Sequence, residues 1–557
     1  MNILEKIREH AYLTPERTVM ICGSRRLTWQ QLWTWSDRLA AWIAAVEQDK
    51  APVAVYGHKN PWMLVCFLAC VKSGRAYCPI DISVPDERVK MILEALPSGI
   101  VLTTETLQFA ADQETACGKR IIGCRDLEEI FQREDLEAPG ADQWVKGDET
   151  YYIIFTSGST GTPKGVQITA DCLGHYLDWS VGLGTSPEQK AGQVFLNQAP
   201  FSFDLSVMDL YTCLACGGTL FCLEKQVQVD YGRLLESLEV SEANVWVSTP
   251  SFADVCLSDP KFDQKLLPGL QVFLFCGETL GNRTARKLQD RFPGAVVVNT
   301  YGPTESTVAV TDVLVTPELA AADHALPVGR TKPGTRIEIH DTDGKSVPEG
   351  EKGEIIIIGD TVSTGYYRQE ELTKKAFFTV GESRAYHTGD EGYLRDGMLY
   401  YCGRIDLQIK LHGYRIELED IENNIRRLPQ ISHAVVIPNQ RGGKVSSLTA
   451  YVVLNEHARK LQEDCGIGLQ TAESAVVQEK QFSSPGTGDL QSGAVSEKQS
   501  GGGYIPEDEK VMSARLKECL AAFLPSYMIP KKFVFLEQMP MTNNGKADRK
   551  LLGGKKA

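Results

Sequence analysis

The stretch YYIIFTSGSTGTPKGVQIT, from Tyr151 to Thr169, begins as an apolar, β-rich run, breaks into a segment of Gly, Ser, Thr, Pro and one Lys, and then resumes. Glycines let backbone N–H groups close around an anion, hydroxyl side chains add donors, and Lys164 adds a positive charge. A simple surface turn gains nothing from this combination. The stretch therefore predicts a buried strand that leads into a phosphate-binding loop.

This loop is not the P-loop of nucleotide hydrolases, which requires the pattern G-x-x-x-x-G-K-[ST]. Pro163 stands five residues after Gly158, and Lys164 is followed by Gly165. The phosphate chemistry therefore belongs to another class of enzyme.

Length and composition indicate a soluble protein of two or more domains, since 557 residues are too many for one hydrophobic core. The apolar run Trp62–Val71 is about half of a membrane span, and the N-terminal segment is typical of an amphipathic helix rather than a signal peptide. Fifteen cysteines in apolar surroundings fit a reduced protein. The net charge of −14 disfavours binding to nucleic acid or anionic membranes. We expect a cytoplasmic protein with no nucleic-acid partner and no stable membrane insertion.

The order of patterns along the chain favours an α/β fold with layered, largely parallel sheets through the first 400 residues or so. From about Pro327 the chain becomes β-rich, and a smaller α+β unit follows after about Asp406. We therefore expect one domain over residues 1–405 and a second over 406–557. Residues 481–503 contain eleven Gly or Ser, which predicts a disordered insertion near 458–507.

Four further stretches carry a family resemblance when they are read with the loop: FSFDLSVMDLY (201–211), NTYGPTEST (299–307), YHTGDEGYLRDGMLYYCGRID (386–406) and PMTNNGKADRK (540–550). They resemble the successive core motifs of adenylate-forming enzymes, including the adenylation domains of peptide synthetases. Because they span nearly the whole chain in the expected order, they are far more specific than any single loop. The resemblance implies a large N-terminal domain of stacked α/β sheets with a β-barrel-like subdomain, and a small, mobile α+β C-terminal domain.

Within this superfamily the chain most resembles the D-alanine:D-alanyl carrier protein ligases, in the segments LNQAPFSFDLSVMDLYTCLACGGTL, NVWVSTPSF, FLFCGETL and QIKLHGYRIELEDIE. The resemblance implies that ATP and Mg²⁺ activate D-alanine, which is then loaded onto a phosphopantetheinylated D-alanyl carrier protein for attachment to teichoic acids. A freestanding peptide-synthetase-type enzyme for another small amino acid, such as L-alanine, is the nearest alternative. An acyl-CoA synthetase and a non-enzymatic nucleotide sensor are more distant ones.

The resemblance also implies an ATP site. In the loop, the β- and γ-phosphates are held by Thr156, Ser157, Gly158, Ser159, Thr160, Gly161, Thr162 and Lys164. In NTYGPTE, Asn299 contacts the adenine edge, Thr304 the α-phosphate and Glu305 the Mg²⁺ ion, with Thr300, Tyr301 and Gly302 in the same site. A carboxylate beside a triphosphate needs such a hard cation between them. Asp390 accepts the ribose hydroxyls, and Arg404 lies near the phosphates or ribose, although it could equally form an interdomain salt bridge.

The catalytic residues implied by the resemblance are Lys546, Thr304 and Arg404. Lys546 follows an Asn-Gly turn that can project its side chain, and it bridges the substrate carboxylate and the nucleotide. Asp406 matches a hinge about which the C-terminal domain rotates, so that Lys546 leaves and the residues around His412, Gly413 and Tyr414 enter for the second step.

The charge of Asp204 and the size of the side-chain pocket indicate which substrate the site accepts. Asp204 stands among aromatic residues, where a carboxylate is costly to bury unless it meets a cation such as the substrate ammonium; the alternative is a helix N-cap. By resemblance, the side-chain pocket is lined by Leu205, Met208, Val247, Leu274, Cys276, Thr300 and Val308, which leave room for about a methyl group. Cys276 either discriminates D- from L-isomers or fills space in the core. Cys213 and Cys216 form a lone C-x-x-C in apolar surroundings, which favours core packing over a metal site.

Overall fold

The computed structural model describes residues 1–110, 114–158, 162–405, 408–411, 414–441, 444–455, 507–542 and 547–553. The chain divides into two compact units. The first holds Met1–Thr156, Pro163–Asp406 and His412–Arg415, and the second holds Ser157–Thr162, Leu407–Leu411 and Ile416–Ala557.

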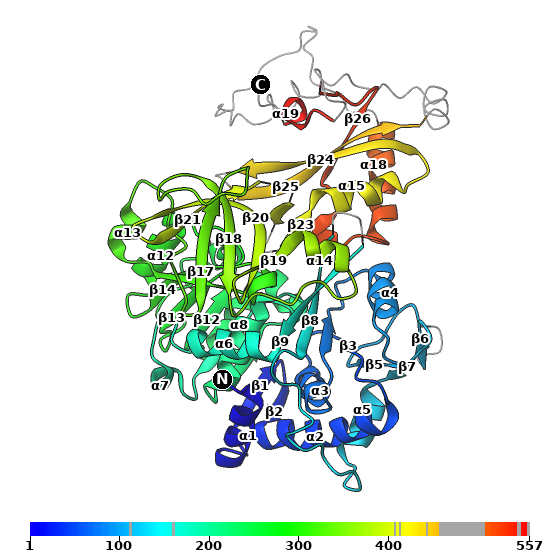
Figure 1. The fold of residues 1–557 in the computed structure, drawn as a ribbon, viewed down its shortest axis with the longest axis vertical. Helices are drawn as coiled ribbons and strands as arrows, with labels where there is room; N and C mark the ends of the chain where they lie inside the picture. The colour runs from blue at the N-terminus through cyan, green and yellow to red at the C-terminus, as the bar shows by residue number, and fades with distance from the viewer. Residues whose placement is uncertain are drawn as a thin grey trace, which may run out of the picture. The chain divides into compact units, whose positions relative to one another are not determined.

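The first unit contains a seven-stranded sheet that is parallel except at its two edges (Figure 1). Its strands, in spatial order, are β6 (Thr115–Ala116), β7 (Lys119–Ile122), β5 (Ile100–Thr103), β3 (Val53–Tyr56), β4 (Tyr77–Ile80), β8 (Thr150–Thr156) and β9 (Lys164–Thr169). In sequence, α2 (Trp29–Val46) precedes these strands, and α3 (Pro61–Lys72), α4 (Asp86–Ala95) and α5 (Cys124–Phe131) lie between them. The strands β3, β4 and β5 are buried along their whole length, as expected for parallel strands covered on both faces.

A nine-stranded sheet follows, again parallel at its centre and antiparallel at its edges. Its strands, in spatial order, are β16 (Arg330–Thr331), β15 (Thr311–Leu314), β14 (Val296–Tyr301), β13 (Val272–Phe275), β12 (Val245–Ser248), β10 (Val194–Asn197), β11 (Thr219–Cys222), β1 (Thr18–Cys22) and β2 (Arg25–Thr28). The remaining helices of this part are α1 (Ile3–Leu13), α6 (Ala170–Ser180), α7 (Pro187–Lys190), α8 (Leu205–Ala215), α9 (Lys225–Val229), α10 (Tyr231–Ser241), α11 (Pro250–Cys256), α12 (Asn282–Arg291) and α13 (Pro317–Ala321).

One hydrophobic cluster joins the two sheets, because it contains side chains from β3, β10, β12 and the helices α3 and α8. Residues 205–214 of α8 are all buried, so this helix lies inside the unit. The predicted stacking of α/β layers is confirmed.

A third sheet in this unit is antiparallel, in agreement with the β-rich pattern after about Pro327. It consists of β17 (Thr335–His340), β18 (Gly353–Gly359), β20 (Ser383–Arg395) and β19 (Phe377–Val380), with β21 (Met398–Arg404) paired to β20. The helix α14 (Glu370–Ala376) precedes β19.

The second unit is a small α+β body. In it, β24 (Ile431–Arg441) pairs antiparallel with β25 (Lys444–Leu454), which pairs parallel with β26 (Lys532–Leu536). The helices among its described residues are α15 (Leu418–Arg426), α18 (Glu507–Ala521) and α19 (Arg549–Leu552). The strand β22 (Gln408–Leu411) pairs with β23 (Tyr414–Glu417), whose last two residues belong to this unit. The insertion predicted near 458–507 lies almost wholly outside the described residues.

Candidate active site

The glycine- and hydroxyl-rich loop is the turn of a β-hairpin. β8 and β9 pair antiparallel up to Thr156↔Lys164, so the loop is not the strand-to-helix turn of a P-loop. Lys164 begins β9, and its Nζ lies 5.5 Å from the centroid of the Tyr366 ring. Ser157 belongs to the second unit, where its hydroxyl accepts a hydrogen bond from the N–H of Glu417 at 3.2 Å. Of the predicted loop residues, Ser159, Thr160 and Gly161 lie outside the described residues.

The predicted adenine- and phosphate-binding residues lie at the carboxyl end of β14 and just beyond it. The Asn299 side chain donates to the carbonyl of Pro327 at 2.9 Å, and the Thr300 hydroxyl donates to the carbonyl of Phe275 at 2.8 Å. Thr304 begins a short 3₁₀ helix, η1 (Thr304–Ser306), and is buried. The carboxyl ends of parallel strands are the usual place for ligand sites in α/β sheets.

Backbone crowding explains the glycine in this segment. A Cβ atom on Gly302 would lie 2.5 Å from Cα of Ala309 and 2.8 Å from the carbonyl oxygen of Val308. Both neighbours are backbone atoms, which cannot swing away as the end of a side chain can. The turn after β14 therefore requires glycine at this position.

Glu305, the predicted Mg²⁺ ligand, is fully buried and ionised. Its Oε1 accepts a hydrogen bond from the Tyr366 hydroxyl at 2.8 Å, and its Oε2 is ion-paired with Arg415, which belongs to the same unit. Burial by itself raises the pKa of this carboxyl, but the charges of Arg415 and Lys164 and the Tyr366 hydrogen bond outweigh it and lower the pKa to about 2. The site therefore keeps a negative charge.

Asp390 and Arg404 form an ion pair across neighbouring strands, β20 and β21. Arg404 Nη1 lies 2.8 Å from Asp390 Oδ1, and the Tyr301 hydroxyl donates to Asp390 Oδ2 at 2.6 Å. Arg404 also donates to the carbonyl of Thr388 at 2.8 Å. This ion pair lies within the first unit rather than between domains. Each carboxylate oxygen can accept a further hydrogen bond, which leaves the predicted ribose contact open.

The predicted side-chain pocket comes together as one buried group in the first unit. Val247 and Leu274 are neighbours in register on β12 and β13, and the Cys276 thiol lies 3.6 Å from the carbonyl oxygen of Val308. All seven predicted positions are buried, and all but Thr300 belong to the hydrophobic cluster that joins the two sheets. The structure therefore brings together residues that are far apart in sequence, from Leu205 to Val308.

Asp204 is 8% exposed and stands at the N-cap position of α8, yet its side chain makes no capping hydrogen bond. The N-cap alternative therefore describes its place in the chain but not the use of its carboxylate. The ring of Phe203, the preceding residue, lies 5.8 Å from the ring of Tyr414.

Two residues of the site were missed by sequence reasoning, namely Tyr366 and Arg415. A buried carboxylate needs partners, and this requirement is the signal that could have prompted a search for them. Lys546 and Asp406 lie outside the described residues. Cys213 and Cys216 are both buried in the apolar core. Across the described ranges, no group of three or more His, Cys, Asp or Glu side chains could hold a metal ion, and no helix has the length and apolar character to cross a membrane.

Comparison with known proteins places these features in a family. Residues 7–367 match the family described as AMP-binding enzyme. The chain is 44% identical over 553 residues to the D-alanine--D-alanyl carrier protein ligases of Bacillus cereus and Bacillus anthracis, with 99% of each chain covered.

Solved structures agree on the fold. An o-succinylbenzoate CoA synthetase from Bacillus subtilis has a TM-score of 0.76 at 20% identity, with 98% of both chains covered. A Vibrio cholerae adenylation domain in complex with glycyl-adenosine-5'-phosphate has a TM-score of 0.73 at 21% identity, with 99% of this chain and 97% of that one covered. The predicted adenylate-forming fold is confirmed.

Proposed function

Because the chain belongs to the family of D-alanine--D-alanyl carrier protein ligases, we propose that it activates D-alanine with ATP as D-alanyl adenylate and transfers the D-alanyl group to the phosphopantetheine thiol of a D-alanyl carrier protein. The observation that carries this proposal is the 44% identity over 99% of both chains. The product serves the D-alanylation of teichoic acids, and the reaction takes place in the cytoplasm. The free thiols of all described cysteines agree with a reducing compartment.

The substrate residues support this choice of amino acid. The buried carboxylate of Asp204 meets the ammonium group of D-alanine, and the buried walls of Leu205, Met208 and Val247 admit a methyl side chain. An acid without an ammonium group would offer this buried carboxylate no positive charge, which disfavours an acyl-CoA synthetase.

Each of the two steps forms one bond at the reacting phosphorus or carbon and breaks another there. In the first, a carboxylate oxygen of D-alanine bonds to the α-phosphorus of ATP, and the bond between this phosphorus and the β-bridging oxygen breaks to release pyrophosphate. In the second, the thiol sulfur bonds to the carbonyl carbon, the bond between this carbon and the phosphate oxygen breaks to release AMP, and the thiol proton passes to solvent. Lys546 and Thr304 stabilise charge in the first step, Lys164 and the loop hold the leaving phosphates, and Asp390 orients the ribose.

The residues around Glu305 fit a Mg²⁺ ion, because an ionised carboxylate is the oxygen ligand that this metal prefers. The ion, when bound, neutralises charge on the triphosphate. Glu305 is the residue that would hold it. Arg415 pairs with Oε2, and a carboxylate oxygen keeps a further lone pair with which it could hold the ion.

Amino-acid-dependent exchange of pyrophosphate into ATP tests the proposal. The full chain is assayed with D-alanine, L-alanine, glycine and D-serine, together with the variants Lys546→Ala and Asp204→Asn. We expect a strong preference for D-alanine, loss of exchange in Lys546→Ala, and a KM for D-alanine raised roughly 10- to 100-fold in Asp204→Asn because a charged hydrogen bond is lost.

A preference for L-alanine or another small amino acid would instead assign the chain to the peptide-synthetase type of adenylation enzyme. No exchange with any amino acid would exclude both functions. Because the Asp204 contact is with the substrate, the KM for ATP in Asp204→Asn should stay within about twofold of wild type.

A further inference from the structure

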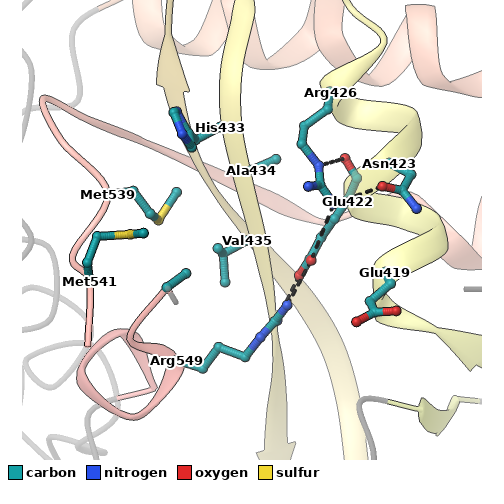
Figure 2. A pocket seen from close by; sticks show the side chains of 11 residues that line it. Glu419, Glu422, Asn423, Arg426, His433, Ala434, Val435, Met539, Met541 and Arg549 are labelled. Atoms are coloured by element: carbon teal, nitrogen blue, oxygen red, sulfur yellow. Dashed lines mark hydrogen bonds and ion pairs between the residues drawn. The ribbon is translucent and has the colours of Figure 1, made fainter. Parts of the chain in front are cut away.

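A two-point ion pair holds the chain just after the predicted catalytic lysine (Figure 2). Arg549, the first residue of α19, lies 2.7 Å from each oxygen of the Glu422 carboxylate on α15, through Nη1 to Oε1 and through Nη2 to Oε2. The Glu422 side chain is 4% exposed and that of Arg549 25%. Such bidentate pairing fixes orientation as well as distance.

The Glu422–Arg549 pair also forms hydrogen bonds with backbone groups at the edge of the three-stranded sheet. Among the strands that the structure describes, β24 lies at one edge of its sheet, and no described strand pairs with its outward N–H and C=O groups. The N–H of Val436 donates to Glu422 Oε1 at 2.7 Å, and its carbonyl accepts from Arg549 Nη1 at 3.1 Å. Glu422, Val436 and Arg549 therefore connect helix α15, strand β24 and helix α19.

The two flanks of residues 543–546 are paired with each other. Met541 and Ala547 form an antiparallel bridge, and the Asp548 N–H donates to the carbonyl of Pro540 at 2.8 Å. At the far end of α19, Leu552 is buried and its carbonyl accepts from the Tyr451 hydroxyl at 3.1 Å.

Packing alone does not fix Arg549 in place. A hollow of about 330 Å³ lies beside it, with Met539 and Met541 on one side and residues of α15 on the other (Figure 2). Directed polar contacts at Arg549 therefore add to the packing of Leu552 in the attachment of this segment.

We propose that Arg549 and Glu422 are positioning residues for the adenylation step, and that they act by holding the segment that carries Lys546. This inference rests on the proposed function for the role of Lys546. It implies that breaking the pair impairs the reaction that uses Lys546 and spares the reaction that does not. A pair that merely stabilised the unit would affect both reactions alike.

The test compares four variants of the full chain. Arg549→Ala and Glu422→Gln break the pair, whereas Arg549→Lys keeps the charge and loses the two-point geometry. Arg426→Ala is the matched control, because Arg426 approaches the same carboxylate at 4.0 Å but lies on α15 itself, so its loss leaves the link between α15 and α19 in place. If Arg549→Ala fails to fold, Arg549→Lys still tests the geometry.

The two half-reactions are measured separately. We expect pyrophosphate exchange with D-alanine to fall roughly 10- to 100-fold in kcat when the pair is broken, by less in Arg549→Lys, and by no more than about twofold in Arg426→Ala. Transfer from synthetic D-alanyl adenylate to pantetheine should stay within about twofold of wild type in all four variants. Equal losses in both half-reactions, or exchange that is unchanged in Arg549→Ala, would overturn the inference.

A second readout does not depend on activity. The rate of cleavage after Lys546 by a lysine-specific protease is followed by mass spectrometry, with intact mass and thermal unfolding as controls for folding. We expect cleavage at least about fivefold faster in Arg549→Ala and Glu422→Gln than in wild type and Arg426→Ala, because local release exposes the segment. Unchanged cleavage would sink the inference, whereas failure of wild-type exchange alone would count only against the proposed function.

Discussion

The Glu305 carboxylate shows at the scale of one residue how the site stores charge. It is fully buried, which opposes ionisation, yet Arg415, Lys164 and the Tyr366 hydroxyl hold its pKa at about 2. A negative charge kept in such a place costs free energy unless its partners stay in position. The negative charge that the proposed metal ion uses therefore depends on Arg415, Lys164 and Tyr366 staying in position.

This linkage predicts an acid-dependent loss of stability. The folded pKa of Glu305 is lower than its usual value of 4.5, so its stabilising contribution is complete above about pH 4.5 and is lost as the pH falls toward 2. The contribution is on the order of 3 kcal/mol. We expect urea unfolding midpoints of Glu305→Gln to fall less than those of wild type between pH 5 and pH 3.

The matched control is Glu371→Gln, since Glu371 forms an exposed ion pair with Lys374 at 3.1 Å. Exposed pairs contribute little to stability, so this variant should follow the wild-type pH dependence. Parallel curves for Glu305→Gln and wild type would contradict the assigned linkage.

At the scale of elements, the turn between β14 and η1 depends on close approach of backbone to backbone. Gly302 faces Val308 and Ala309, and both Thr307 and Val308 have positive φ values, 62° and 68°. Non-glycine residues in this conformation carry strain of about 1–3 kcal/mol, which the surrounding structure must over-determine. The hydrogen bond from the Thr307 hydroxyl to the Thr361 carbonyl, 2.8 Å long, is one such restraint.

We therefore predict that Gly302→Ala displaces this turn. The thermal midpoint should fall by several degrees and the KM for ATP should rise roughly tenfold or more, because Thr304 and Glu305 follow within the same turn. Gly232→Ala is the control, since Gly232 lies inside α10 and a Cβ there would meet its nearest atom only at 3.7 Å. This change should leave activity unaltered and raise the midpoint slightly. An unaltered KM for ATP in Gly302→Ala would contradict the role of the turn.

At the scale of the whole molecule, the chain forms two compact units, and the longest segment of the first unit, Pro163–Asp406, ends at Asp406. We propose that Asp406 is the hinge about which the C-terminal domain rotates between the two half-reactions. Rotation at a hinge changes φ and ψ of a few residues, and proline removes the freedom of φ.

Asp406→Pro should therefore separate the two half-reactions. One of them should fall at least about tenfold while the other stays within about threefold of wild type, as measured by pyrophosphate exchange and by transfer from D-alanyl adenylate to pantetheine. Asp406→Gly keeps the backbone free, and both of its rates should stay within about threefold of wild type. Equal rates in Asp406→Pro and Asp406→Gly would argue against a hinge at this residue.

Much of the fold and the site could be predicted, because the signals are local. Alternating apolar runs predicted the layered parallel sheets, and the order of motifs led to the adenylate-forming fold. The partners of the motif residues could not be predicted in this way. Arg415 is 110 residues from Glu305, and Tyr301 is 89 residues from Asp390. Such contacts depend on how sheets pack, which no local pattern contains.

The sequence by itself determined which chemical groups are present: a glycine- and hydroxyl-rich loop with Lys164, a carboxylate at Asp204 among aromatic residues, and the Thr-Glu pair after a buried strand. These follow from residue type and spacing, which act over a few positions of the chain. Only the tertiary structure decided that the loop connects the two strands of a hairpin, that Arg404 pairs with Asp390, and that Arg549 forms an ion pair with Glu422 beside β24. Each of these depends on strand register and on the meeting of distant elements, because an ion pair forms only where folding brings both charges together.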